Sequence, residues 1–310
     1  MSHVYGVVPS RRLGRSLGIS TIPFKTCNYS CIYCQLGRTT NMTDRRQSFY
    51  PYEEILCQAR DFISRYGEDS FDVVSIVGEG EPTLFSPLDE ITKGLRELTS
   101  RPLVLITNGS LLHDVSTRNE IMDFDIVMPT LDAFDQESFR RINRPFGKLS
   151  FESVFEGLAK FSREFDGEIW LEVMLIKGYN DDRNSLAKLN KEIETVNPHR
   201  VYINVPARPP AENYVKIPDE NSLEFAKTLL GATGIEKLPE SSFLSVEDDA
   251  FGAVLEIIKR HPMTEIDIEA LLREKFGEES AEQVLRKLDD DASVEKSIYR
   301  GKVFYRYASR

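Results

Sequence analysis

Along most of the chain, the pattern of hydrophobic and polar positions changes repeatedly between a strand-like and a helix-like form. Extended apolar stretches alternate with amphipathic ones, in which apolar residues recur every three or four positions. The extended stretches are residues 17–24, 72–78, 103–107, 125–131, 169–176 and 200–206. The helical patterns are residues 52–67, 87–98, 151–165, 184–196 and 219–232. This alternation predicts crossover units and therefore a parallel sheet in an α/β fold.

The number of predicted strands limits the architecture further. Six strands are too few for a closed eight-stranded barrel, and they suit an open sheet or a partial barrel. In both arrangements ligands bind where the carboxyl ends of the strands meet the following loops. We therefore expect functional residues directly after strands.

The pattern changes near the carboxyl end of the sequence. Pro and Ser interrupt it in "KLPESSFLSVEDD", and three short helical patterns follow, at residues 248–262, 266–277 and 280–290. The segment after them alternates on both sides of "YRGK", which indicates a β-hairpin. Three helices and a hairpin resemble a winged-helix domain. We predict a core at residues 1–231, a linker at 232–247 and a winged-helix-like domain at 248–310.

Charge is distributed unevenly along the chain. The whole sequence has a net charge of −11, which argues against a general nucleic-acid binder. The third C-terminal helical pattern is acidic, which disfavours insertion into a DNA groove, so we expect this domain to dock substrate or a partner protein. The first fifty residues instead hold seven Lys or Arg and one Asp, for a local net charge of +6.

Three of the four cysteines lie close together in the basic N-terminal region. Cys27, Cys31 and Cys34 have the spacing C-x3-C-x2-C and follow the first predicted strand. Three thiolates can bind three irons of a [4Fe–4S] cluster and leave the fourth iron open to a small molecule. The alternative is a zinc knuckle or three structural thiols, but zinc needs another ligand and only His3 is near in sequence. Cys57, in the first helical pattern, is predicted to be a small buried hydrophobe.

The cysteine spacing, with Tyr33 before the last thiol, resembles that of the radical S-adenosylmethionine (SAM) enzymes. The segment "VYGVVPSRRLGRSLGISTIPFKTCNYSCIYCQLGRTT" resembles a branch of iron–sulfur oxidoreductases similar to the wybutosine tRNA-modifying enzyme, and the resemblance covers about residues 5–231. It implies a partial (β/α)6 TIM-like barrel and one three-cysteine [4Fe–4S] cluster whose open iron binds SAM. A reductant such as ferredoxin or flavodoxin then drives cleavage of SAM to a 5′-deoxyadenosyl radical.

Further residues match segments that bind SAM or substrate in this family. Gly80-Glu81-Pro82, with Gly78 before it, resembles the family's "GGE" motif, although Glu79 replaces its first glycine; a plain acidic turn is the alternative. Asn108 and Asp132 end the third and fourth strands, where they alternatively form a tight turn and a helix cap. The family resemblance also makes candidates of Glu172, Lys177 and Asn180 after the fifth strand, and of Asn204 and Arg208 after the sixth; Asn180 alternatively caps the next helix.

Basic side chains also recur at a predicted rim loop, at Arg140, Arg141, Arg144 and Lys148. A positive mouth on an acidic protein would attract an anionic substrate, such as tRNA, a nucleotide or another metabolite. We therefore expect a cytoplasmic radical SAM enzyme that acts on an RNA base or a metabolite, with no membrane segment. Two alternatives remain at this point: an iron–sulfur winged-helix redox sensor that regulates DNA binding, and an electron-transfer protein.

Overall fold

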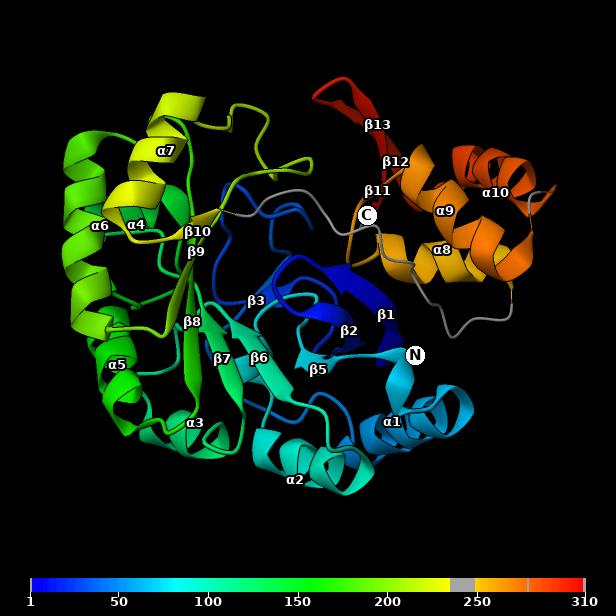
Figure 1. Ribbon diagram of the computed structural model, residues 1–310, viewed down its shortest axis with the longest axis horizontal. Coiled ribbons are helices and arrows are strands. Elements are labelled where there is room, and N and C mark those ends of the chain that lie inside the picture. Colours follow the sequence, from blue (N-terminus) through cyan, green and yellow to red (C-terminus); the bar gives the residue numbers. More distant parts are fainter. Residues whose placement is uncertain (1, 235–248, 278, 309–310) are drawn as a thin grey trace.

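The computed structural model describes residues 2–234, 249–277 and 279–308 of the chain. These residues form a large unit and a smaller C-terminal unit, which lie side by side (Figure 1). The predicted linker at residues 232–247 falls mostly outside the described residues, so the domain boundaries stay a prediction.

The large unit is built on one sheet in which β1 is antiparallel and all other strands are parallel. In sheet order, the strands in the described residues are β1 (Val4–Ser10), β2 (Gly14–Ile19), β5 (Val73–Ile76), β6 (Leu103–Thr107), β7 (Ile126–Pro129), β8 (Glu168–Met174), β9 (Arg200–Asn204) and β10 (Thr233–Gly234). All six predicted strands are present, as β2 and β5 to β9. The sequence did not predict β1 or β10, nor a separate short pair, β3 (Thr26–Cys27) and β4 (Asn41–Met42).

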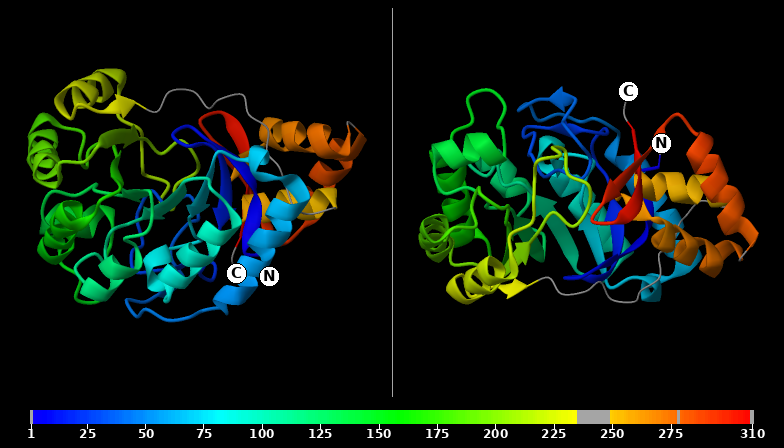
Figure 2. Two further views of the ribbon diagram at one scale, coloured as in Figure 1. Left: turned by 60° about the horizontal axis from the view of Figure 1, so that its bottom comes forward. Right: turned by 90° about the horizontal axis from the view of Figure 1, so that it is seen from above.

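Helices cover the outer face of this sheet, as the crossover units predict (Figures 1 and 2). They are α1 (Tyr52–Tyr66), α2 (Leu88–Leu98), α3 (Val115–Glu120), α4 (Gln136–Ile142), α5 (Phe151–Glu164), α6 (Arg183–Val196) and α7 (Glu220–Leu229). The five predicted helices correspond to α1, α2, α5, α6 and α7. The sequence analysis missed α3 and α4, which are only six and seven residues long and contain too few apolar repeats to register as periodic.

One prediction on α1 is wrong. Ile55, Ala59 and Phe62 are buried and recur at helical spacing, so they define the face that packs on the sheet. Cys57 lies two positions after Ile55, which turns it about 200° around the helix axis. Its side chain is therefore exposed instead of being a buried hydrophobe.

The two faces of the strands bury different apolar clusters because side chains alternate along a strand. Val74, Leu103 and Leu105 belong to the large core between sheet and helices. Val73 and Val104 point the other way and join Trp170 and Tyr202 in a smaller cluster inside the curved sheet. This inner cluster fills only part of the interior, and a cavity described below occupies the rest.

The C-terminal unit contains the predicted helices and hairpin. Its elements are α8 (Ala250–Ile258), β11 (Met263–Thr264), α9 (Glu265–Phe276), α10 (Glu279–Asp290), β12 (Val294–Tyr299) and β13 (Lys302–Tyr307), with the strand order β11-β13-β12. Arg300 and Gly301 connect the hairpin at φ 52° and 73°, the left-handed values of a tight two-residue turn. The unit buries its own apolar core, and Val8 of β1 packs against that core. Its description as winged-helix-like stays a proposal.

Candidate active site

The three-cysteine loop lies at the carboxyl end of β2, where the sequence analysis placed it. Its backbone is held on the C-terminal end of α4: Ser30 N donates to Asn143 O at 3.0 Å, and Ile32 N donates to Ile142 O at 3.0 Å. Within the loop, Cys34 N donates to Cys31 O at 3.1 Å. These bonds fix the positions of the thiols before any cofactor binds.

Amide groups and burial define the environment of the thiols. Asn108 Nδ2 donates to Cys27 Sγ at 3.7 Å, and Asn143 Nδ2 donates to Cys31 Sγ at 3.5 Å. Burial raises the pKa of all three thiols, so they are neutral unless a positive group stabilises the thiolates. In the described part of the chain, no group of three or more His, Cys, Asp or Glu side chains could hold a single metal ion. A zinc knuckle holds four ligands on one ion, whereas in an iron–sulfur cluster each thiolate binds a different iron.

The Gly-Glu-Pro turn packs directly against the start of the cysteine loop. Lys25 N donates to Glu79 O at 2.6 Å, and Glu81 N donates to Thr26 O at 3.1 Å. A Cβ atom at Gly80 would lie 1.7 Å from Thr26 O, so this position admits only glycine. The motif therefore belongs to the site, and it couples the end of β5 to the residue before Cys27.

The Glu81 carboxylate is fully occupied within the protein. It is buried and accepts hydrogen bonds from Thr83 N, Thr107 Oγ1 and Asn108 N at 3.0, 2.5 and 2.7 Å. Pro82 begins the short helical turn that places Thr83 there. Glu81 thus joins the ends of β5 and β6, and only backbone groups of this turn are left to meet a ligand.

Asp132 is linked to the cysteine loop rather than to a helix. It is buried and accepts hydrogen bonds from Tyr33 Oη at 2.5 Å, Asn143 Nδ2 at 3.1 Å and Met174 N at 2.7 Å. Burial raises the pKa of Asp132 to about 6. The alternative interpretation of Asp132 as a helix cap is wrong, because Asp135 caps α4.

Asn180 and Glu172 also have partners inside the protein. Asn180 Nδ2 donates to Asp132 O at 3.0 Å and its Oδ1 accepts from Ile176 N at 2.8 Å, while Asp182, not Asn180, caps α6. Glu172 accepts a hydrogen bond from Asn204 Nδ2 at 2.7 Å and pairs with the guanidinium of Arg12. Lys177 is remote from these groups and lies 3.8 Å from Asp219 at the surface.

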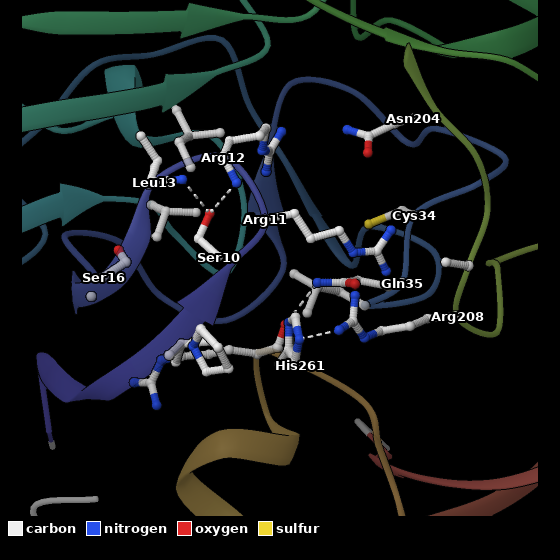
Figure 3. A pocket seen from close by; sticks show the side chains of 18 of the residues that line it. Ser10, Arg11, Arg12, Leu13, Ser16, Cys34, Gln35, Asn204, Arg208 and His261 are labelled. Carbon is white, nitrogen blue, oxygen red and sulfur yellow. Dashed lines mark hydrogen bonds between the residues drawn. The ribbon is translucent and has the colours of Figure 1, made fainter. Parts of the chain in front are cut away.

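A cavity of about 390 Å³ opens beside the cysteine loop. Its walls come from both edges of the sheet, from residues 33–36 of the cysteine loop and from the C-terminal unit (Figure 3). Of the predicted site residues, Gly78, Cys34, Asn204 and Arg208 line it. Asn108 and Asp132 instead line a separate void of about 20 Å³, which is the size of one water molecule. The large cavity is therefore the candidate binding site.

The cavity also contains residues that the sequence analysis did not single out as site residues. Arg12 and Arg11 come from the turn between β1 and β2, and Arg260 and His261 follow α8. The only signal in the sequence was the basic run in the first fifty residues, which contains both arginines of the turn. The local sequence around residues 260–261 did not indicate that these side chains line the cavity.

The predicted basic rim is partly neutralised at its centre, where one carboxylate binds two arginines. Arg144 Nη1 lies 2.5 Å from Glu212 Oε1, and Arg38 makes two bonds to the same carboxylate, at 2.8 and 2.9 Å. Arg141 lies over the ring of Tyr179, with 5.0 Å from its guanidinium carbon to the ring centre. Arg140 and Lys148 are exposed. Positive charge without a carboxylate partner is found inside the cavity rather than at Arg144.

Comparison with known proteins identifies the large unit. The family model of the Radical SAM superfamily matches residues 21–189. The UPF0026 protein MJ1312 of Methanocaldococcus jannaschii is 35% identical over 315 residues, covering 98% of this chain and 96% of that protein. The match therefore extends through the C-terminal unit.

Two solved structures are similar to the chain. Streptococcus suis SuiB bound to its precursor peptide SuiA aligns with a TM-score of 0.51 and 14% identity, over 67% of this chain and 45% of that one. TYW1 with a bound lysine–pyruvate adduct aligns with a TM-score of 0.46 and 18% identity, over 94% of this chain and 80% of that one. The likeness to SuiB confirms the partial TIM-like barrel of the core. The chain belongs to the radical SAM superfamily, whose members are enzymes that use a [4Fe–4S] cluster and SAM.

Proposed function

We propose that the protein is a single-cluster radical SAM enzyme in which Cys27, Cys31 and Cys34 ligate three irons of a [4Fe–4S] cluster. The observation that carries this proposal is the cavity of about 390 Å³, because Tyr33 and Cys34 of the cysteine loop form part of its wall. An electron-transfer protein has no need of a cavity of this size beside its cluster. An enzyme that binds SAM and a substrate next to its cluster does need such a cavity.

The residues around the thiols fit such a cluster. The side-chain amides of Asn108 and Asn143 donate to two of the sulfurs, and hydrogen bonds to cluster thiolates tune and stabilise the group. The raised pKa of the buried thiols fits as well, because positive iron would supply the charge that the protein lacks. When bound, the reduced cluster supplies the electron that cleaves SAM, which is chemistry of the cofactors themselves.

The other predicted residues support this site in two ways. Gly78 lines the cavity, and we assign the backbone of the turn Gly78–Pro82, which includes Gly80 and Glu81, to contact with SAM. Asn108, Asp132 and Asn180 fix the cysteine loop and the ends of β6, β7 and β8 through the hydrogen bonds described above. Glu172 holds Arg12 at the cavity wall, and we assign this pair to orient the ribose end of SAM.

The charge of the cavity supports our proposal for the substrate, and family membership supports our proposal for the electron donor. The substrate is anionic, an RNA base or a metabolite, and the C-terminal unit helps to bind it because Arg260 and His261 form part of the cavity wall. A cytoplasmic protein such as ferredoxin or flavodoxin supplies electrons. In the described residues no helix has the length and apolar character to cross a membrane.

Anaerobic reconstitution tests the reaction class. Protein loaded with iron and sulfide is mixed with dithionite and SAM, and 5′-deoxyadenosine is measured by chromatography. We expect product from the native protein and from Cys57→Ala, whose thiol is exposed on α1, and none from Cys31→Ala. A native protein that binds iron but does not cleave SAM would support electron transfer instead, and bound zinc in place of iron would reject the cluster.

A further inference from the structure

The cavity has an unusual charge for a protein with a net charge of −11. Its described lining includes four arginines and no Asp or Glu: Arg11, Arg12, Arg208 and Arg260. Two of these charges are compensated from behind the wall, since Arg12 pairs with Glu172 and Arg260 lies 3.2 Å from Glu79. The other two are not.

Arg11 and Arg208 are the uncompensated pair. Among the described residues, the Arg11 guanidinium makes no hydrogen bond or ion pair. Arg208 donates from Nε to Pro262 O at 3.2 Å and from Nη2 to His261 Nε2; the charge of Asp267 acts on it from a distance, but no described carboxylate forms an ion pair with it. Burial lowers the pKa of Arg208 to about 10, so the side chain is still charged at neutral pH. A guanidinium that is desolvated without a counter-ion costs free energy unless a ligand brings the negative charge.

The two side chains approach each other from opposite edges of the sheet. Arg11 comes from the turn between β1 and β2, Arg208 comes from the loop after β9, and Figure 3 shows Arg11 extending toward Cys34 and Arg208. The Nε2 atom of His261 accepts the bond from Arg208, so the neutral ring carries its proton on Nδ1. Burial and the two arginines keep the pKa of His261 well below its usual value, which preserves this form. His261 therefore holds Arg208 without adding a competing charge.

We propose that Arg11 and Arg208 form a subsite for one anionic group, a phosphate or a carboxylate, of a small-molecule substrate, and that His261 positions Arg208. This inference rests on the proposed function and names the chemistry by which its substrate is held. Guanidinium forks match the planar or tetrahedral oxygens of such anions. The anion would lie on the Cys34 side of the cavity, which would bring the attached molecule next to the cluster loop.

Size and surface charge favour a small molecule over RNA. A cavity of about 390 Å³ is in the range of small-molecule sites, about 300–1,000 Å³. A polynucleotide needs a positive track outside the cavity to contact successive phosphates. At the centre of the rim, Arg38 and Arg144 both bind the carboxylate of Glu212, which leaves one net positive charge for the two guanidiniums instead of a continuous positive track.

Anion binding to the reconstituted full-length protein tests the proposal. Thermal unfolding is followed as inorganic phosphate or malonate replaces chloride at constant ionic strength, since a ligand of the folded state raises the unfolding midpoint. The variants are Arg11→Gln and Arg208→Gln, and Arg45→Gln is the matched control because it removes the same charge from an exposed side chain outside the cavity. We expect at least one anion to act saturably on the native protein and the control, and its half-saturating concentration to rise tenfold or more in both cavity variants. The anion that acts shows whether the group is a phosphate or a carboxylate.

His261 requires a readout that a general loss of packing would not change. In His261→Gln the side-chain oxygen can still accept a bond from Arg208, whereas in His261→Leu it cannot. We expect anion binding to weaken about tenfold in the leucine variant and to recover largely in the glutamine variant. Equal loss in both, with equal unfolding midpoints in chloride, would reject the positioning role.

Three outcomes would overturn the subsite. The first is an absence of any effect of either anion beyond that of chloride on the native protein. The second is tighter, Arg11- and Arg208-dependent binding of a ten-nucleotide single-stranded RNA, which would make the substrate a polymer. The third is a parallel loss of SAM affinity, which would mean that the arginines hold the carboxylate of SAM. If anion binding behaves as expected but 5′-deoxyadenosine never forms, the proposed function fails while the subsite stands.

Discussion

Glu79 Oε1 lies 3.2 Å from Arg260 Nε, and both side chains are buried where the C-terminal unit meets the barrel. Glu79 occupies the position of the first glycine of the "GGE" motif. Ser20 Oγ also donates to its carboxylate at 3.0 Å, and Arg260 Nη2 donates to Ser2 O at 3.0 Å. The replacement of glycine by Glu79 thus has a structural role: a glycine here has no side chain to pair with Arg260 and could not connect the C-terminal unit to the turn.

A double-mutant cycle tests this contact. Arg260→Gln leaves the Glu79 carboxylate buried without its partner, and we expect a loss of about 3 kcal/mol in the free energy of unfolding. Adding Glu79→Gln removes the uncompensated charge, so we expect the double variant to recover about 1–2 kcal/mol relative to the sum of the single effects. Urea titration of the reconstituted protein gives these values, and strictly additive losses would show that the two residues do not interact.

Two neighbouring glycines provide a matched test of the turn. A Cβ at Gly80 would collide with the backbone oxygen of Thr26, whereas one at Gly78 would meet Cδ1 and Cγ1 of Ile22 at 3.0 Å and come no closer to backbone than 3.6 Å, at Gly80 N. We expect Gly80→Ala to lower the free energy of unfolding by about 3 kcal/mol and to reduce iron content, because the start of the cysteine loop must move. Gly78→Ala serves as the control, with a loss below about 1 kcal/mol and iron content unchanged. Similar iron content in both variants would contradict the coupling of this turn to Cys27.

Iron content distinguishes the four cysteines. We expect Cys27→Ala, Cys31→Ala and Cys34→Ala each to lose the visible absorption of the cluster and most of the bound iron. Cys57→Ala should retain both, since its thiol points to solvent from α1. Iron and acid-labile sulfide assays measure the effect, and full iron loading of Cys31→Ala would reject the proposed ligands.

The shared carboxylate of Glu212 predicts a pH dependence. Hydrogen bonds and charge from Arg38 and Arg144 lower the pKa of Glu212 from 4.5 to about 2. A depressed carboxyl pKa adds stability that is complete above the unfolded value near 4.5 and disappears as the pH falls toward 2. Because Arg38 is largely exposed, we discount this contribution to about 1–2 kcal/mol.

The measurement is the difference in unfolding free energy between native protein and Glu212→Gln. It should be about 1–2 kcal/mol at pH 7 and should shrink between pH 4.5 and pH 3. Cluster-free protein is used for both, since protonation of the thiols would release iron at low pH. Glu156→Gln, which removes an exposed carboxylate on α5, should show no such trend. A pH-independent difference for Glu212→Gln would contradict the assigned cause.

The elements that could be predicted from the sequence are those whose own local residue pattern is sufficient to identify them. A short apolar run such as Val73-Val74 or Leu103-Val104-Leu105 indicates a buried strand whichever neighbours it has, and the cysteine spacing identifies its own chemistry. β1 was missed because "VYGVVPS" contains glycine and proline and has a register shift between Tyr5 and Val7, which breaks the two-residue alternation.

Contacts between distant segments carry no such local signal. The pairing of Glu79 with Arg260, and the approach of Arg11 to Arg208, depend on how two units and two sheet edges come together. Charge counting found the positive character of the N-terminal region but could not tell which arginines are compensated. For that reason it assigned weight to Arg144, which is paired with Glu212, and not to Arg11.

Because His261 forms part of the cavity wall, the residues for cluster binding and those for substrate recognition are far apart in the sequence. The thiols that would carry the radical chemistry are complete by residue 34, whereas part of the recognition surface is encoded more than two hundred positions later. Residues that determine substrate preference can therefore change, in evolution or by design, in a segment that contains none of the proposed cluster ligands. We expect relatives of this chain to differ first in this wall when they diverge in what they modify.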